Sequence, residues 1–288
     1  MRINHKSLRA FAAGFAYLCR QPLGALGLVI VVIILGGALL AEYLVLADPV
    51  KLSIRDKFLA PSLAHPFGTD YLGRDVYSRV VAGSRIAMTA ALVAISVSAG
   101  VGLILGIISG MGPRWLDYGM LLVFDTLRSF PVVMFALAVV TLIGPSLSTI
   151  IVIVIVISIP LFGRAVRTQT LTLKNSEFIQ AEISMGASLP RLMGIHILPN
   201  VLGPIMILAA MEIPVVISME AGLSFLGFGV RPPTPSWGNI LNDGFKYIRN
   251  SPWPLIFGGL PIIFATLGFT FLGESLRDIL DPRLRKET

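Results

Sequence analysis

Long apolar stretches alternate with short polar ones along most of this chain. A run of about 20 apolar residues is long enough to cross a bilayer as a helix. Six such runs occur, and we expect each to form a transmembrane helix. They cover approximately residues 24–46, 86–110, 118–142, 147–163, 201–224 and 254–273. The pattern therefore predicts an all-α integral membrane protein with six transmembrane helices.

The composition agrees with this interpretation and narrows the chemistry. The 288 residues are 55% hydrophobic and only 14% charged, whereas soluble domains carry about 25% charged residues. The net charge of +7 comes from Lys and Arg at the ends of apolar runs, so we expect no nucleic-acid partner. The single cysteine, Cys19, precludes an internal disulfide framework and any multi-cysteine metal site. No metal site and no catalytic residue are expected.

Lys and Arg near the span ends predict the orientation. Basic residues gather before the first run, in the loop 163–200 and after the last run, whereas the short connection 143–146 has no charge. Both termini are therefore expected in the cytoplasm. The first run exceeds the 7–15 residues of a signal-peptide core, so we expect it to be retained. Residues 47–85 disagree, because they lie outside in this topology and carry six basic residues, which four Asp largely offset.

The second run contains glycines spaced four residues apart, at Gly102, Gly106 and Gly110. This spacing places them on one helix face, where a neighbouring backbone can approach closely. We expect packing inside one subunit, with a subunit interface as the alternative.

A polar segment, QAEISMGASLPRLMGIHILPN, lies between the fourth and fifth apolar runs. We expect a short helix over NSEFIQAEISMG, capped by Asn175 or Ser176 and ended by Gly186 in a left-handed turn. A second helical turn over ASLPRLMGIHI follows, and Pro199 marks the entry to the fifth span. The sequence therefore predicts a helix–glycine–helix elbow lying against the membrane.

The spacing within this elbow resembles the signature of the permeases of ABC importers, Glu-Ala-Ala, three residues, Gly, then about nine residues before Ile-x-Leu-Pro. Gln180, Ala181 and Glu182 stand at the Glu-Ala-Ala positions, Gly186 at the glycine, and Leu198 and Pro199 at the end. Gln180 and Glu182 depart from the pattern, and His196 replaces the isoleucine. The ending HILPN is similar to that of the peptide branch.

Further segments resemble the C-type subunit of dipeptide, oligopeptide and nickel permeases, in order from about residue 60 to the end. They are HPFGTDYLGRDVYSRVVAGSRIA at 65–87, RTQTLTLKNSEFIQAE, SFLGFG, PPTPSWGNIL, SPW and LRDILDPRLR. The resemblance implies a type I ABC importer permease fold in a bacterial inner membrane. It also implies two parts: residues 1–85, with the tail, first span and external segment, and a five-helix core, 86–288, with a coupling loop at 171–200.

In that family the elbow is the coupling helix, which docks in a groove of a cytoplasmic ATPase. The implied docking residues are Gln180, Ala181, Glu182, Gly186, Ala187, Leu198 and Pro199. The implied partners are a homologous B-type permease subunit, two ABC ATPase subunits, an extracytoplasmic substrate-binding protein and membrane lipids. The chain has no phosphate-binding loop of the G-x-x-x-x-G-K-[ST] type. ATP and Mg are thus expected on the ATPases, and this chain is expected to be no enzyme.

Four acids fall within or at the ends of the spans: Glu42, Asp125, Glu212 and Glu220. We expect Asp125 to pair with Arg128 on the same helical face, and Glu42 and Glu220 to be hydrated near outer ends. Glu212 lies about 18 Å along the fifth span, near mid-membrane. It either faces the translocation path and meets a substrate amine or cation, or is protonated or hydrogen-bonded between subunits. Asp125 and Met134 are further candidates for the path.

The loop 227–253 mixes prolines with aromatic residues, which commonly anchor at the membrane interface. The resemblance implies a docking surface for the substrate-binding protein instead, with Pro233 and Trp237 as contacts. Arg74 and Asp75 in the external segment either share that role or pair locally.

The leading hypothesis is therefore the permease subunit of an ATP-driven importer of di- or oligopeptides. The same architecture importing nickel or another metal chelate is an alternative. From another class, a standalone ion-coupled transporter would use Glu212 and Asp125 as its relay, although no inverted repeat is visible. An intramembrane enzyme is disfavoured, because no nucleophile–base pair can be built inside the bilayer.

Overall fold

The computed structural model describes residues 18, 19 and 21–280, and it is built from helices. Among these residues no β-strand forms, and one isolated bridge joins Thr69 and Asp75. The basic tails that support a cytoplasmic location of both termini lie largely outside the described residues. The elements are α2 (Pro22–Leu39), α3 (Ala41–Leu44), the 3-10 turn η1 (Ile54–Asp56), α4 (Val76–Met111), α5 (Arg114–Ser129), α6 (Val132–Ile143), α7 (Leu147–Lys174), α8 (Glu177–Ser184), α9 (Leu189–Arg191), the π-helical η2 (Leu192–Ile197), α10 (Leu198–Phe225), α11 (Trp237–Lys246) and α12 (Trp253–Leu280).

Five helical segments in the described chain are long and apolar enough to cross a membrane. They are Pro22–Leu39, Val76–Met111, Leu147–Lys174, Leu189–Phe225 and Trp253–Ile279. The pair α5 and α6 passes the same test together, but it is bent by 86°. The six predicted spans are therefore present if this bent pair counts as one.

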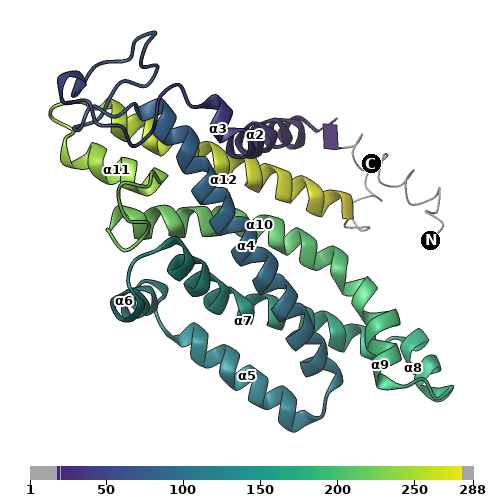
Figure 1. Ribbon diagram of the computed structural model, residues 1–288. Coiled ribbons are helices and arrows are strands. Elements are labelled where there is room, and N and C mark those ends of the chain that lie inside the picture. The colour runs from purple at the N-terminus through teal and green to yellow at the C-terminus, as the bar shows by residue number, and fades with distance from the viewer. Residues whose placement is uncertain (1–17, 20, 281–288) are drawn as a thin grey trace. The chain divides into compact units, whose positions relative to one another are not determined.

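The third span was predicted as one helix over 118–142, and the structure breaks it at Phe130 and Pro131. Proline lacks a backbone donor and disfavours helical geometry in the residue before it. Phe130 is accordingly extended, with φ −80° and ψ 132°. The expected span is thus two shorter helices set at a steep angle (Figure 1).

The chain divides into two compact units, one containing residues up to 90 and from 210 onward, the other residues 91–209. In the first unit α2 packs against α12 (Figure 1). The contact is close at Gly27, where an added β-carbon would lie 2.8 Å from the backbone nitrogen of Leu272. The expected boundary between residues 85 and 86 remains a prediction.

In the second unit the three spaced glycines of α4 face α7. An added β-carbon would lie 2.5 Å from Cβ of Phe162 at Gly102, 2.6 Å from the carbonyl oxygen of Gly163 at Gly106, and 2.6 Å from Thr170 at Gly110. No larger residue fits without separating the helices. The prediction that these glycines pack inside one subunit is confirmed.

Two segments of the first unit fold together into a structure that we call the cap, residues 45–80 and 226–253. Val76 and Val80 at the start of α4 form a small hydrophobic core with Ile240 of α11. Phe67 packs against this core and stacks on Phe257 of α12, with ring centroids 4.1 Å apart. The cap is therefore anchored on the ends of α4 and α12.

Candidate functional site

The elbow between α7 and α10 is closed by a Schellman motif at Gly186. The amide of Ala187 donates to the carbonyl of Glu182 at 3.0 Å, and the amide of Gly186 donates to that of Ile183 at 2.9 Å. Gly186 has φ +82°, a left-handed conformation that glycine adopts without the strain of a side chain. The helix over residues 177–184 and its glycine stop were both predicted from the sequence.

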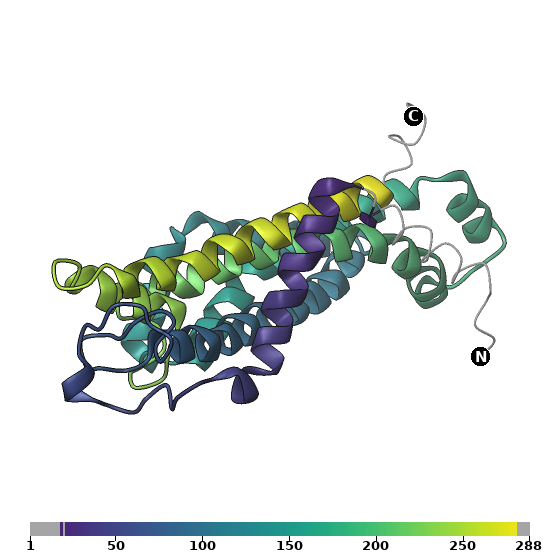
Figure 2. The same cartoon turned by 90° about the horizontal axis from the view of Figure 1, so that it is seen from above.

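The two arms of the elbow enclose a small apolar centre. Ile179 of α8 is buried together with Leu192 and Ile197 of η2. Gln180 ties α8 back to α7, because its side-chain amide donates to the carbonyl of Lys174 at 2.8 Å. In Figure 2 the elbow lies at the end of α7 and α10. It is therefore a folded projection of the second unit rather than a loose loop.

The outer surface of the elbow is apolar around its tip. Ile183, Met185 and Leu189 are exposed there, and Met185 is 73% exposed. The space around Gly186 is open, with no atom within 4 Å of an added β-carbon. Exposed apolar clusters of this kind commonly mark interaction surfaces. The geometry suits docking of a partner against the tip.

The other predicted elbow residues are distributed over both arms. Ala181 is exposed on α8, Ala187 is partly buried after the turn, and Pro199 is exposed in the first turn of α10. Leu198 is partly buried beside it. The six residues preceding them, Leu192–Ile197, form a π-helix, a feature that is frequent at functional sites.

Two ion pairs join α5 to α7 in the second unit. The guanidinium of Arg167 donates twice to the carboxylate of Asp117, at 2.5 and 2.6 Å. Arg164, one helical turn earlier, pairs with Asp125. The predicted local pair of Asp125 with Arg128 is wrong, because Arg164 on the neighbouring helix takes its place.

Glu220 was expected to be hydrated near an outer span end, and this expectation is wrong. The residue is fully buried, because α11 packs over the last turns of α10. Its Oε1 accepts a hydrogen bond from Ser224 at 2.7 Å, and its Oε2 has no hydrogen-bond partner among the described residues. Glu42, by contrast, is exposed and pairs with Arg85, as expected for a hydrated acid.

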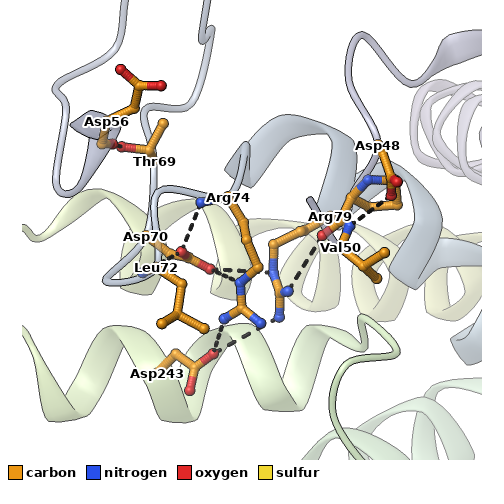
Figure 3. A network of polar contacts seen from close by, with 10 residues as sticks. Asp48, Val50, Asp56, Thr69, Asp70, Leu72, Arg74, Arg79 and Asp243 are labelled. Atoms are coloured by element: carbon orange, nitrogen blue, oxygen red, sulfur yellow. Dashed lines mark hydrogen bonds and ion pairs between the residues drawn. The ribbon is translucent and has the colours of Figure 1, made fainter. Parts of the chain in front are cut away.

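The cap contains a buried network of two arginines and two aspartates (Figure 3). Arg74 donates to Asp70 at 2.6 Å and to Asp243 of α11 at 3.0 Å. Arg79 of α4 lies 3.6 Å from Asp70 and 3.8 Å from Asp243. Burial raises the pKa of the Asp243 carboxyl, and the two guanidinium groups oppose this shift. The network links the segment 70–79 to α11.

Asp75 performs two structural tasks beside this network. Its Oδ2 accepts from the amide of Ser78 at 2.7 Å, in the first turn of α4, and its Oδ1 lies 2.9 Å from Nδ1 of His65. Arg74 and Asp75 are both buried. Both side chains are therefore paired within the cap, as the local-pairing alternative predicts, and they offer little surface to a partner.

Trp237 lies inside the first unit instead of at its surface. It is only 1% exposed, and its indole nitrogen donates to the carbonyl of Val80 at 2.9 Å. The expectation that it anchors at the membrane interface is wrong, because the cap folds over it. Pro233, in the preceding loop, is exposed and remains a predicted partner contact.

The sequence analysis missed Asp70, Arg79, Asp243 and the pair Asp117–Arg167. Each depends on a partner distant in sequence, such as Arg74 with Asp243. One available signal was the spacing of Arg164 and Arg167, which are three residues apart and therefore share a helix face. Glu212, Met134 and Asp125 lie on three different helices, α10, α6 and α5.

Comparison with known proteins gives the family. The sequence model of the family described as "Binding-protein-dependent transport system inner membrane component" matches residues 102–286. The dipeptide transport system permease protein DppC of Alkalihalophilus pseudofirmus is 35% identical over 98% of this chain and 93% of its own length. The glutathione transport system permease protein GsiD of Pectobacterium atrosepticum is 36% identical over 92% of this chain and 89% of its own.

These matches confirm the resemblance that the elbow and the segments after residue 60 suggested. Together with the apolar helices, they indicate a multi-pass membrane protein. Spans, elbow and sequence together show that this chain belongs to the family of binding-protein-dependent transport system inner membrane components, as a C-type permease of the type I ABC importer fold.

Proposed function

We propose that this chain is the C-type permease subunit of an ATP-driven, binding-protein-dependent importer of di- or oligopeptides. It forms half of a translocation pathway with a B-type permease subunit, and a substrate-binding protein delivers the cargo. The peptide assignment is supported by relatives named for dipeptide and glutathione transport. Import of nickel or another metal chelate by the same architecture remains the alternative cargo.

The observation that carries the proposal is the rigid elbow with its open, apolar tip. An ATPase that changes shape needs a stiff element to push, and the Schellman motif and the buried centre around Ile179 stiffen this one. Exposed Met185 and the unobstructed backbone at Gly186 form a surface that can enter a groove on the ATPase. The residues Gln180, Ala181, Glu182, Ala187, Leu198 and Pro199 then act as the coupling segment.

The test separates steric blocking of the docking surface at Gly186 from backbone strain. Gly186→Ala and Gly186→Trp both place a side chain at φ +82°, which costs about 1–2 kcal/mol. Only the tryptophan fills the open space. We expect both variants to insert in the membrane, and only Gly186→Trp to lose co-purification with the ATPase subunits. Gly36→Trp, at an equally open position on α2, is the control for bulk elsewhere. Normal ATPase binding by Gly186→Trp would refute the docking role.

The cargo is tested with the assembled importer in vesicles. Stimulation of ATP hydrolysis and uptake by short peptides, with none by nickel salts, supports the peptide assignment, and the reverse result favours the metal alternative. Glu212, Met134 and Asp125 remain proposed path residues. For Glu212, equal uptake of cationic and neutral peptides by Glu212→Gln and the parent across pH would remove it from the path. ATP-independent uptake by the single chain would instead favour an ion-coupled transporter.

A further inference from the structure

An apolar cavity of about 400 Å³ opens in the first unit beside the cap. Its walls are formed by α2, the first turns of α4, the N-terminal half of α12 and Phe67 of the cap. The three helices are candidate membrane spans. The lining residues used below are Ile33, Ile34, Phe67, Val80, Phe257 and Phe264.

Water is a poor occupant for this cavity. An ordered water needs two to four polar partners, and every lining side chain is apolar. At the cap end, the stacked rings of Phe67 and Phe257 border the cavity. An apolar molecule is therefore the favoured occupant.

The position of the cavity shows where such a molecule comes from. Phe257 and Phe264 are seven residues apart on α12, so the cavity extends about 10 Å along the helix. Val80 lies in the second turn of α4, and Ile34 lies near the end of α2, which places the cavity at the cap end of the spans. Ile33 is 66% exposed at its edge and Phe264 is 49% exposed. Both residues belong to helices long and apolar enough to cross a membrane, so the cavity opens on the lateral surface of these helices and not at their ends.

We propose that this cavity binds one acyl chain of a phospholipid from the leaflet on the cap side. The acyl chain lies between α2 and α12. Its contacts replace those that the two helices cannot make with each other across the cavity. Because Phe67 belongs to the cap, the bound chain also supports the packing of the cap on α12. Binding of a lipid at this cavity is independent of the cargo that the importer carries.

The test uses two preparations of the full chain. One is purified in detergent from membranes, for native mass spectrometry. The other is placed in nanodiscs that contain phosphatidylethanolamine with a photoreactive group on the acyl chain, for cross-linking. Ile34→Trp fills the cavity from α2. Leu26→Trp makes the same change two helical turns away, at a position outside the cavity that is 49% exposed. We expect native mass spectrometry to show phospholipid retained by the parent and by Leu26→Trp. Retention by Ile34→Trp is expected to fall about tenfold. Cross-links in the parent are expected at Ile33, Ile34 and Phe264.

Three results would overturn the proposal. The first is a parent that retains no phospholipid, and the second is equal retention by Ile34→Trp and the parent. The third is a cross-link to another protein from a photoreactive residue placed at position Ile33. That result would show that a helix of a partner protein occupies the cavity. If Ile34→Trp does not accumulate, Ile33→Trp at the exposed edge provides the same comparison. Unchanged mobility of the cap at Phe67, measured by spin labelling after delipidation, would refute the supporting role of the bound chain.

Discussion

Nε2 of His196 lies 3.8 Å from Oε2 of Glu182, so these two side chains join the two arms of the elbow. Both positions depart from the family signature, Glu182 where alanine is usual and His196 where isoleucine is usual. The structure shows that these departures are neighbours. The contact lies between α8 and η2, the two helical arms of the elbow.

The contact predicts that the two side chains are energetically coupled. A double-mutant cycle of Glu182→Ala and His196→Ala, read by thermal unfolding, is expected to give an interaction of about 0.5–1 kcal/mol. An interaction energy of zero would show that the two residues are merely adjacent.

The two ion pairs between α5 and α7 are expected to differ in strength. Arg167 binds Asp117 through two parallel hydrogen bonds in a partly buried site, and lysine cannot reproduce this geometry. Arg167→Lys should therefore lower the free energy of unfolding by about 1–2 kcal/mol. The pair of Arg164 with Asp125 is more exposed, so Arg164→Lys should change it by less than about 0.5 kcal/mol. Equal losses in the two variants would contradict this ranking.

The buried carboxyl of Glu220 supplies a third prediction. Glu220→Gln keeps an oxygen that accepts from Ser224 and nearly the same side-chain shape, so thermal stability in detergent should stay close to that of the parent. Glu220→Leu leaves the Ser224 hydroxyl without its acceptor, which costs about 1–3 kcal/mol. Equal stability of Glu220→Leu and the parent would show that the hydrogen bond to Ser224 contributes nothing.

Asp243 should make the cap sensitive to pH in a defined direction. Its pKa is raised above the ordinary value of 3.8, chiefly by burial. The folded chain therefore holds a proton that the unfolded chain releases. The stability that this proton contributes is complete below pH 3.8 and is lost as pH rises through the raised pKa.

Asp243→Asn cannot take up this proton, so its unfolding midpoint should fall less than that of the parent as pH rises through this range. Asp48→Asn, at an exposed position in the other segment of the cap, should preserve the parent's pH profile. Identical profiles for Asp243→Asn and the parent would contradict the assignment.

Local sequence was sufficient for the elbow. The helix start after Ser176, the stop at Gly186 and the turn after Pro190 each depend on residues within one or two helical turns. Ser176 occupies the expected first position, but its hydroxyl donates to the carbonyl of Leu173 and makes no capping bond. The spaced glycines of α4 were also correctly assigned to packing within the chain, because residues four apart share one helix face, and that face contacts α7. Spans of about 20 apolar residues were detectable for the same reason, since the bilayer constrains each one separately.

Long-range contacts corrected the rest. Asp125 had Arg128 three residues away, yet Arg164 on another helix is its partner. Trp237 and Glu220 were assigned to wet or interfacial surroundings, and the fold of the cap buries both. Nothing near these residues in the sequence indicates which surface will be covered.

The sequence by itself determined the apolar runs that form the spans, the elbow and the family, because each depends on apolar run length, turn chemistry or motif spacing. The tertiary structure alone decided which charges meet and where the cap closes. It also showed where apolar space stays open between α2 and α12. The physical reason is that burial and ion pairing are properties of neighbours in space, and helix packing brings together residues as distant as Arg74 and Asp243.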